Sequence, residues 1–174
     1  MLKSRSSGIP RIMGVLNVTP DSFHANSRVG SNEDISERAL EMFNEGADWL
    51  DAVVSYIGQN MQYLENYLTK NAPLINFKRP EGTYLAWLDF SGWMEKIGAT
   101  HLAASENKKK DNDAPKIYAG DIMERVLVEK AGVQLDRGYR FGAGGESFMR
   151  MNVGTSRQLL KRALDNIANA IKAN

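Results

Sequence analysis

Apolar side chains recur every three or four positions between residues 48 and 70, and this spacing places them on one face of an α-helix. The stripe consists of Leu50, Val53, Val54, Ile57, Met61, Leu64 and Leu68. Residues 71–73, Asn-Ala-Pro, interrupt the pattern, because a proline ring disfavours continuation of a helix. The pattern predicts a long helix over 48–70 that packs one face against a core.

Short apolar and aromatic runs predict strands on both sides of this helix. The clearest is 83–90, which is rich in aromatic and other β-favouring residues. Weaker candidates are 74–77, 133–135 and 147–153. A further apolar run, 12–18, ends in a turn signal, and its unbroken apolar character suits a sheet that is covered on both faces.

Four other segments have helical patterns. One begins at Glu33, with acidic residues in the first turn, where the helix dipole favours negative charge. The others lie over 91–98, over 122–130 with Asp121 as the expected cap, and over the last part of the chain to Ile171. Because the strands cluster instead of alternating strictly with helices, the order predicts an α+β fold.

Residues 1–10 are expected to form a flexible N-terminus. The two family resemblances given below imply that the rest divides into a β-α segment over 11–48 and a main domain over 49–174. Within the main domain, 104–116 is the most polar stretch and contains three consecutive lysines, so we expect a flexible, exposed loop there. The predicted strand 12–18 is expected to add to the edge of the main domain's sheet.

The composition is that of an ordinary globular protein. Of the 174 residues, 43% are hydrophobic and 25% are charged, and the net charge of +1 favours neither nucleic acid nor an anionic membrane as a partner. The chain has no cysteine, which excludes disulfides and thiol catalysis, and its two histidines, His24 and His101, lie far apart, so no metal site is expected. No apolar run reaches the roughly 18 residues that span a bilayer, and no signal peptide is evident, so we predict a cytoplasmic protein.

Residues 11–23 read Arg-Ile-Met-Gly-Val-Leu-Asn-Val-Thr-Pro-Asp-Ser-Phe and resemble the opening strand and first loop of dihydropteroate synthase. The resemblance covers about residues 11–51 and implies a position at the C-terminal mouth of a (β/α)8 barrel. It also implies that Asn17 helps to hold magnesium and the pyrophosphate of a pterin substrate. The family's second signature does not follow, and such a barrel needs about 250 residues, so we expect a β-α remnant. Turn chemistry is the alternative role for Asn17 and Asp21.

Two further motifs occur in order, 79–90 (Arg-Pro-Glu-Gly-Thr-Tyr-Leu-Ala-Trp-Leu-Asp-Phe) and 141–152 (Phe-Gly-Ala-Gly-Gly-Glu-Ser-Phe-Met-Arg-Met-Asn). Together with 49–52 and 128–133, they resemble the C-terminal small domain of fold-type I pyridoxal-phosphate (PLP) enzymes. The branch is that of cystathionine β-lyase and the C–S lyases, close to class I and II aminotransferases. The resemblance covers about 48–174. It implies an aminotransferase-like α+β small domain, with a small antiparallel or mixed sheet covered by helices and an added N-terminal β-α unit.

The resemblance implies that Arg150 binds the α-carboxylate of a substrate. A guanidinium forms two parallel hydrogen bonds with a carboxylate, which an ammonium cannot match. The alternative for Arg150 is a structural ion pair with Glu146, Asp89 or the last helix. Two aromatic residues of the predicted strand, Tyr84 and Trp87, are expected to be core residues.

The resemblance also implies PLP as the cofactor. PLP needs a Schiff-base lysine, an acid beside its pyridinium nitrogen and a group of phosphate-binding residues. In the family these lie in a large domain that precedes the small domain, and here the synthase-like segment stands in its place. That role cannot be assigned to the lysines of the matched segments, which are Lys70, Lys78, Lys96 and Lys130. We therefore expect no catalytic residue in this chain and no cofactor bound by it.

These features predict a chimera, natural or constructed, of a pterin-type β-α piece and a PLP-enzyme small domain. The expected function is that of a folded chimeric or truncated domain without complete catalytic machinery. Two alternatives stay open: a fragment of a PLP-dependent lyase or aminotransferase that another chain completes, and a pterin-binding remnant. The apolar face that a large domain would cover predicts self-association, so a homo-oligomer is expected.

Overall fold

The computed structural model describes residues 36–37, 40, 46–111 and 113–173. The chain divides into two units, Met1–Val54 and Ser55–Asn174, which are described separately. Residues 1–10 and the predicted strand 12–18 lie outside the described residues.

The predicted long helix is confirmed as α2 (Ala47–Asn71). In the second unit its apolar stripe is buried at Met61, Leu64 and Leu68. In the first unit Leu50 and Val54, which belong to the same predicted stripe, are exposed. Within the part of the chain that the structure describes, the stripe meets a core along the C-terminal part of the helix.

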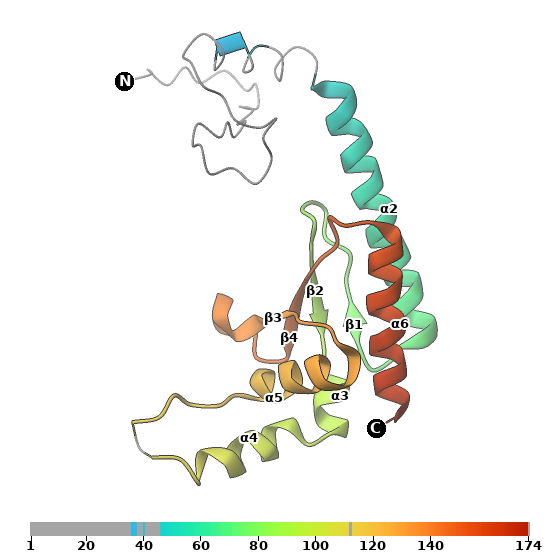
Figure 1. Cartoon of the computed structure of the whole chain (residues 1–174). Helices are drawn as coiled ribbons and strands as arrows, with labels where there is room; N and C mark the ends of the chain where they lie inside the picture. Colours follow the sequence, from blue (N-terminus) through green and yellow to red (C-terminus); the bar gives the residue numbers. More distant parts are fainter. Residues whose placement is uncertain (1–35, 38–39, 41–45, 112, 174) are drawn as a thin grey trace. The chain divides into compact units, whose positions relative to one another are not determined.

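A four-stranded antiparallel sheet forms the centre of the second unit, in the order β1-β2-β4-β3 (Figure 1). Its strands are β1 (Asn76–Phe77), β2 (Leu85–Asp89), β3 (Asp136–Arg137) and β4 (Phe148–Asn152). The predicted α+β fold is confirmed, and three of the strands fall within the predicted runs. The strand expected at 133–135 is wrong, because β3 forms only where Asp136 comes opposite β4.

The other helices of this unit are α3 (Ser91–Lys96), α4 (Ala99–Asn107), α5 (Ala119–Val126) and α6 (Arg157–Ala173), with a π-helical turn η2 (Leu127–Ala131) and a 3₁₀ turn η3 (Gly138–Phe141). The sequence pattern did not predict α4, whose residues lack an apolar stripe. The stretch expected as a loop from residue 104 therefore begins inside this helix. Gly132 ends η2 in the left-handed conformation at φ 61°, which favours glycine at the end of a helix.

The core lies between one face of the sheet and the pair α2 and α6, which Figure 1 shows side by side. Alternation along the strands sends Ala86 and Leu88 of β2 into this core, together with Met149 and Met151 of β4. Leu160 and Leu164 are among the residues that α6 adds to it. The remaining residues of β2 and β4 lie on the opposite face of the sheet.

Asn60 is a fully buried polar residue of α2. Its Nδ2 donates hydrogen bonds to the carbonyl oxygens of Val153 (2.9 Å) and Thr155 (2.8 Å), and its Oδ1 accepts one from Nε of Arg157 (2.7 Å). Burial of the amide is tolerated because both its donors and its acceptor have partners. These bonds join α2 to the turn between β4 and α6.

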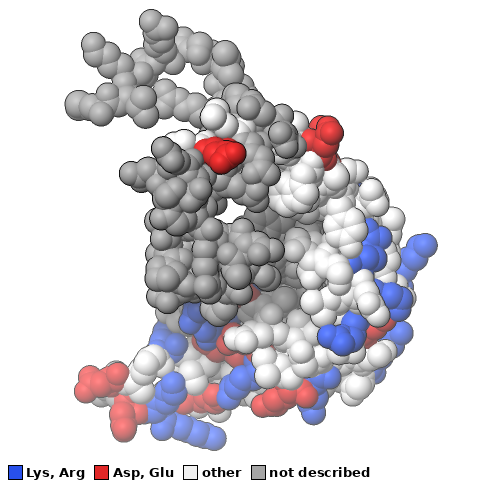
Figure 2. Space-filling view, turned by 45° about the horizontal axis from the view of Figure 1, so that its top comes forward, with Lys and Arg blue, Asp and Glu red and all other residues white. Residues whose placement is uncertain are grey.

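Charged residues of both signs are interspersed among the described residues on the face drawn in Figure 2. None of the described helices combines the length and the apolar character that crossing a lipid bilayer demands.

Candidate functional site

Arg150 lies in the middle of the sheet, between two cross-strand neighbours. In the β2–β4 ladder it is opposite Trp87, and in the β3–β4 ladder it is opposite Asp136. Residues directly opposite one another on antiparallel strands point to the same face. The pairing therefore brings an aromatic ring, a guanidinium and a carboxylate together on the face away from the α2–α6 core.

The guanidinium of Arg150 is held on one edge and on one face. Nη2 and Nε donate to the same oxygen, Oδ2 of Asp136, at 2.7 Å and 3.2 Å. Its Cζ lies 4.2 Å from the centre of the Phe141 ring, within cation–π range. An ion pair was one expectation for Arg150, but the expected partners Glu146, Asp89 and α6 are wrong, because Asp136 on the neighbouring strand occupies that place.

A shallow pocket of about 300 Å³ is lined by Phe141, the residue whose ring faces this guanidinium; Arg150 itself does not line it. Three aromatic side chains line it, and the Trp87 ring packs edge-on against Phe141 and Phe148 at centroid distances of 5.5 Å and 6.1 Å. Phe141 also carries the guanidinium of Arg150 on its ring, so the aromatic cluster connects the pocket to the charged group.

The expectation that Tyr84 and Trp87 belong to the core is wrong. The side chain of Trp87 is 37% exposed and that of Tyr84 is 49% exposed. The strand period of two explains the Trp87 error, because burial of Ala86 and Leu88 places Trp87 on the other face.

The glycine-rich segment 142–145 forms the rest of the pocket wall. Gly142 and Gly144 have φ angles of 126° and 87°, which only glycine adopts readily. Gly138, in η3, lies so close to β4 that an added Cβ would come within 2.6 Å of the carbonyl oxygen of Phe148. The segment is thus a tight bend before β4.

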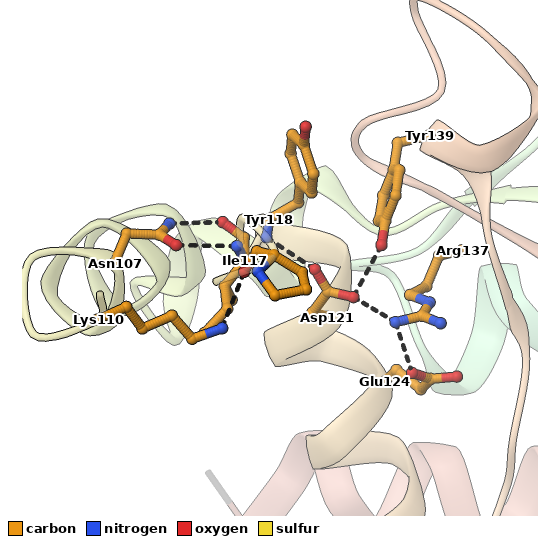
Figure 3. Close-up of polar contacts among 9 residues, drawn as sticks. Asn107, Lys110, Ile117, Tyr118, Asp121, Glu124, Arg137 and Tyr139 are labelled. Carbon is orange, nitrogen blue, oxygen red and sulfur yellow. Dashed lines mark hydrogen bonds and ion pairs between the residues drawn. The ribbon is translucent and has the colours of Figure 1, made fainter. Parts of the chain in front are cut away.

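A polar cluster on α5 holds β3 and η3 in place (Figure 3). Oδ1 of Asp121 accepts hydrogen bonds from Arg137 and from the hydroxyl of Tyr139 (2.9 Å). Its Oδ2 accepts one from the backbone N–H of Tyr118 (2.7 Å). Arg137 also pairs with Glu124 at 3.2 Å. The cluster therefore anchors the strand that carries Asp136 to a helix.

Asp121 does cap α5, but from inside the helix. We expected it just before the helix, whereas α5 begins at Ala119 and Asp121 is its third residue, bonding back to the N–H of Tyr118. Burial alone would raise the pKa of Asp121. The hydrogen bonds that its carboxylate accepts from the backbone N–H, the tyrosine and the arginine outweigh this and hold the pKa below its ordinary value. Burial and the bond to Asp121 raise the pKa of Tyr139.

No lysine lines the pocket beside Phe141. A second pocket of about 510 Å³ contains His101, Glu95 and Glu146, but none of the residues that line either pocket is a lysine. One of the lysines considered above, Lys96, instead donates from Nζ to the carbonyl oxygen of Ile171 at 3.2 Å. A Schiff base to PLP requires a lysine amine inside the site.

Sequence reasoning located Arg150 but not the residues around it. Asp136 carries no signal in the sequence, and Phe141 was recognised only as part of the motif 141–152. Their contacts with Arg150 depend on strand pairing and on the fold of η3. Asn17, the candidate for pterin and magnesium binding, lies outside the described residues. Among the described residues, no three His, Cys, Asp or Glu side chains are grouped so that they could hold a metal ion.

Comparison with known proteins shows two separate similarities. Residues 13–85 match the family described as pterin binding enzyme. The match begins within the motif recognised at 11–23 and extends beyond residue 51, where the resemblance by motifs ends. The N-terminal region is thus similar to pterin binding enzymes.

About three quarters of the chain is similar to PLP enzymes. Cystathionine beta-lyase PatB of Bacillus subtilis is 30% identical over 129 residues, which are 74% of this chain and 27% of that protein. Protein MalY of Escherichia coli is 28% identical over 134 residues, 77% of this chain and 28% of that protein. The chain therefore spans less than a third of the length of these relatives.

Solved structures agree with this similarity. The PLP-bound C-S lyase from Staphylococcus hominis matches with a TM-score of 0.60 and 28% identity, covering 76% of this chain and 30% of that chain. A PLP-bound putative aminotransferase from Clostridium difficile 630 matches with a TM-score of 0.59 and 32% identity, covering 75% of this chain and 28% of that chain. Both predicted resemblances are confirmed, as is the aminotransferase-like form of the small domain.

Proposed function

We propose that this chain is a folded chimeric domain that recognises a carboxylate through Arg150 and lacks complete PLP-dependent machinery. One observation supports this above all. The guanidinium of Arg150 stands beside an aromatic pocket on the sheet face away from the α2–α6 core, while no lysine lines either pocket of the described residues. This arrangement supports binding of a carboxylate by Arg150, with no lysine lining the pocket next to it.

The geometry of Arg150 supports carboxylate binding. Its side chain is 27% exposed, and among the described residues Nη1 has no hydrogen-bond partner. A planar guanidinium with a free donor binds a carboxylate through short, charge-assisted hydrogen bonds. The pocket lined by Trp87, Phe141 and Phe148 would receive the apolar part of the same ligand.

The test is incubation of the full chain with PLP, followed by borohydride reduction and mass spectrometry. We expect no absorbance of bound PLP at the short-wavelength end of the visible range. We also expect that no single lysine is modified in stoichiometric yield. A single lysine modified stoichiometrically would contradict the proposal, because it would show that the chain itself holds the cofactor.

A second candidate is a PLP-dependent lyase or aminotransferase whose site another polypeptide completes. The exposed aromatic face around Trp87 and the 27–30% share of the relatives that the chain covers favour it. The test is co-expression with the part of PatB outside the matched region, followed by assay of β-elimination from cystathionine. Activity that disappears in Arg150→Ala would support this candidate over a domain without catalysis.

A third candidate is binding of a pterin at the N-terminal segment, which the family match over 13–85 favours. Calorimetry with a pterin pyrophosphate and magnesium tests it, with Asn17→Ala as the control. Saturable micromolar binding that the substitution abolishes would support a pterin site.

A further inference from the structure

Asp136 accepts hydrogen bonds from only one edge of the Arg150 guanidinium, the edge with Nε and Nη2. Both Nη2 and Nε donate to the single oxygen Oδ2, at 2.7 Å and 3.2 Å, so the Nε edge is occupied. The ring of Phe141 lies 4.2 Å from Cζ and covers one face. Among the described residues, Nη1 donates no hydrogen bond. The side that includes Nη1 is therefore the part of the group left for a ligand.

The position of Asp136 is itself fixed by its neighbour in the chain. Successive residues of a strand point to opposite faces, so Asp136 points towards Arg150 while Arg137 points towards α5. Arg137 bonds there to Asp121 and pairs with Glu124 at 3.2 Å. Its side chain is 18% exposed, against 52% for Asp136. A two-residue strand thus has a buried anchor on one face and a positioned carboxylate on the other.

We infer that Asp136 is a positioning residue: it holds the Nε edge of Arg150 so that the Nη1 side is presented to the carboxylate of a ligand whose apolar or aromatic group enters the adjoining pocket. This inference rests on the proposed function and deepens it by naming the ligand class. A fixed guanidinium loses less side-chain entropy when it binds. The ligand class follows from the three aromatic residues that line the pocket.

Asp136 could instead compete with the ligand for Arg150, and this role predicts the opposite change in ligand affinity when Asp136 is removed. A carboxylate that only competed with the ligand for Arg150 would weaken binding, and its removal would strengthen binding. A carboxylate that orients Arg150 would strengthen binding, and its removal would weaken binding even though a negative charge has been taken away. The sign of the change in affinity separates the two roles.

The experiment is ¹⁵N NMR of the arginine side chains in the full chain, with the Nε–H signal of Arg150 assigned by its loss in Arg150→Lys. We expect hydrogen exchange at this Nε–H to become about tenfold faster in Asp136→Ala, because a charge-assisted hydrogen bond is lost. Sodium phenylacetate is then titrated against sodium chloride of equal ionic strength. We expect saturable shifts of the Arg150 signal in the parent protein and binding at least about threefold weaker in Asp136→Ala.

Two further variants complete the test. Asp136→Asn keeps the shape of the side chain and accepts a weaker bond, so its exchange rate should lie between those of the parent and Asp136→Ala. It decides the question if Asp136→Ala does not fold. Glu106→Ala removes an acid from another exposed ion pair, the 2.6 Å contact with Arg125, and should leave the Arg150 signal unchanged.

The outcomes distinguish the inference from the function on which it rests. Unchanged exchange in the Asp136 variants, or tighter phenylacetate binding in them, would overturn the positioning role. Slow hydrogen exchange at the Nε–H of Arg150 in the parent protein would support the orientation of Arg150 by Asp136. If phenylacetate then caused no shift of the Arg150 signal, the proposed function and the ligand class would be contradicted.

Discussion

Asn60 contributes to stability at the scale of a single residue, because its amide makes three hydrogen bonds in a fully buried place. We expect Asn60→Ala to lower the free energy of unfolding by about 3 kcal/mol, since two carbonyl oxygens and a guanidinium lose a partner. Urea unfolding measures the change. Asn66→Ala, at an exposed position of the same helix, should change it by less than about 0.5 kcal/mol. Equal effects of the two substitutions would contradict this role of Asn60.

Asp121 predicts a pH dependence of stability. Its folded-state pKa is lowered by the bonds to Tyr118, Tyr139 and Arg137, although burial acts in the other direction. A group with a lowered folded pKa stabilises the protein above its unfolded pKa, about 3.9 for aspartate, and this contribution is lost as the pH falls through the folded pKa. We therefore expect Asp121→Asn to destabilise by about 2 kcal/mol at pH 7 and by much less near pH 3. Urea unfolding at both pH values checks this, and a gap that does not shrink in acid would contradict it.

The residues of the candidate site differ in how far they could be predicted. Arg150 is recognisable because it lies in a motif, with apolar neighbours that make an unpaired charge costly. Its partner Asp136 is 14 residues away in the sequence and meets it only through the β3–β4 ladder. Local pattern carries no information about such a pairing.

The turn η3 depends on the absence of a side chain at Gly138. At Gly138 an added Cβ would lie 2.6 Å from the carbonyl oxygen of Phe148 and 2.8 Å from its Cβ. We expect Gly138→Ala to destabilise the protein by about 3 kcal/mol, because the turn must move away from β4. Thermal and urea unfolding measure this. Gly82→Ala is the matched control, since a Cβ there meets nothing within 4 Å, and a similar loss in both variants would contradict the steric explanation.

The sequence predicted the elements whose apolar residues repeat with helix or strand spacing. It did not predict the elements that form because of contacts with other parts of the chain. α2, β2 and β4 have apolar patterns that match helix or strand geometry, and the structure places them within a few residues of the predicted bounds. α4 has a weak pattern and was missed. β3 was misplaced, because a two-residue strand exists only where a partner strand offers hydrogen bonds.

At the scale of the whole molecule, the exposed aromatic side chains of Trp87 and Phe141 lead us to expect self-association. Trp87 and Phe141 are 37% and 48% exposed, next to one another, on the sheet face away from the α2–α6 core. We expect light scattering to show a mass that rises with concentration, and Trp87→Ser to shift the population towards monomer, since exposed apolar surface is buried on association. Val128→Ser, at a residue of similar exposure on η2, is the control. A monomer at every concentration would contradict the prediction.

The sequence by itself determined the two resemblances, the α+β class and the long helix, because motifs and hydrophobic periods are local properties of the chain. It also singled out Arg150. Only the tertiary structure decided that Trp87 lies on the exposed face, that Asp136 holds Arg150, and that Asn60 joins α2 to the turn before α6. Each of these depends on contacts between residues far apart in the sequence, and such contacts form only when the strands pair and the helices pack.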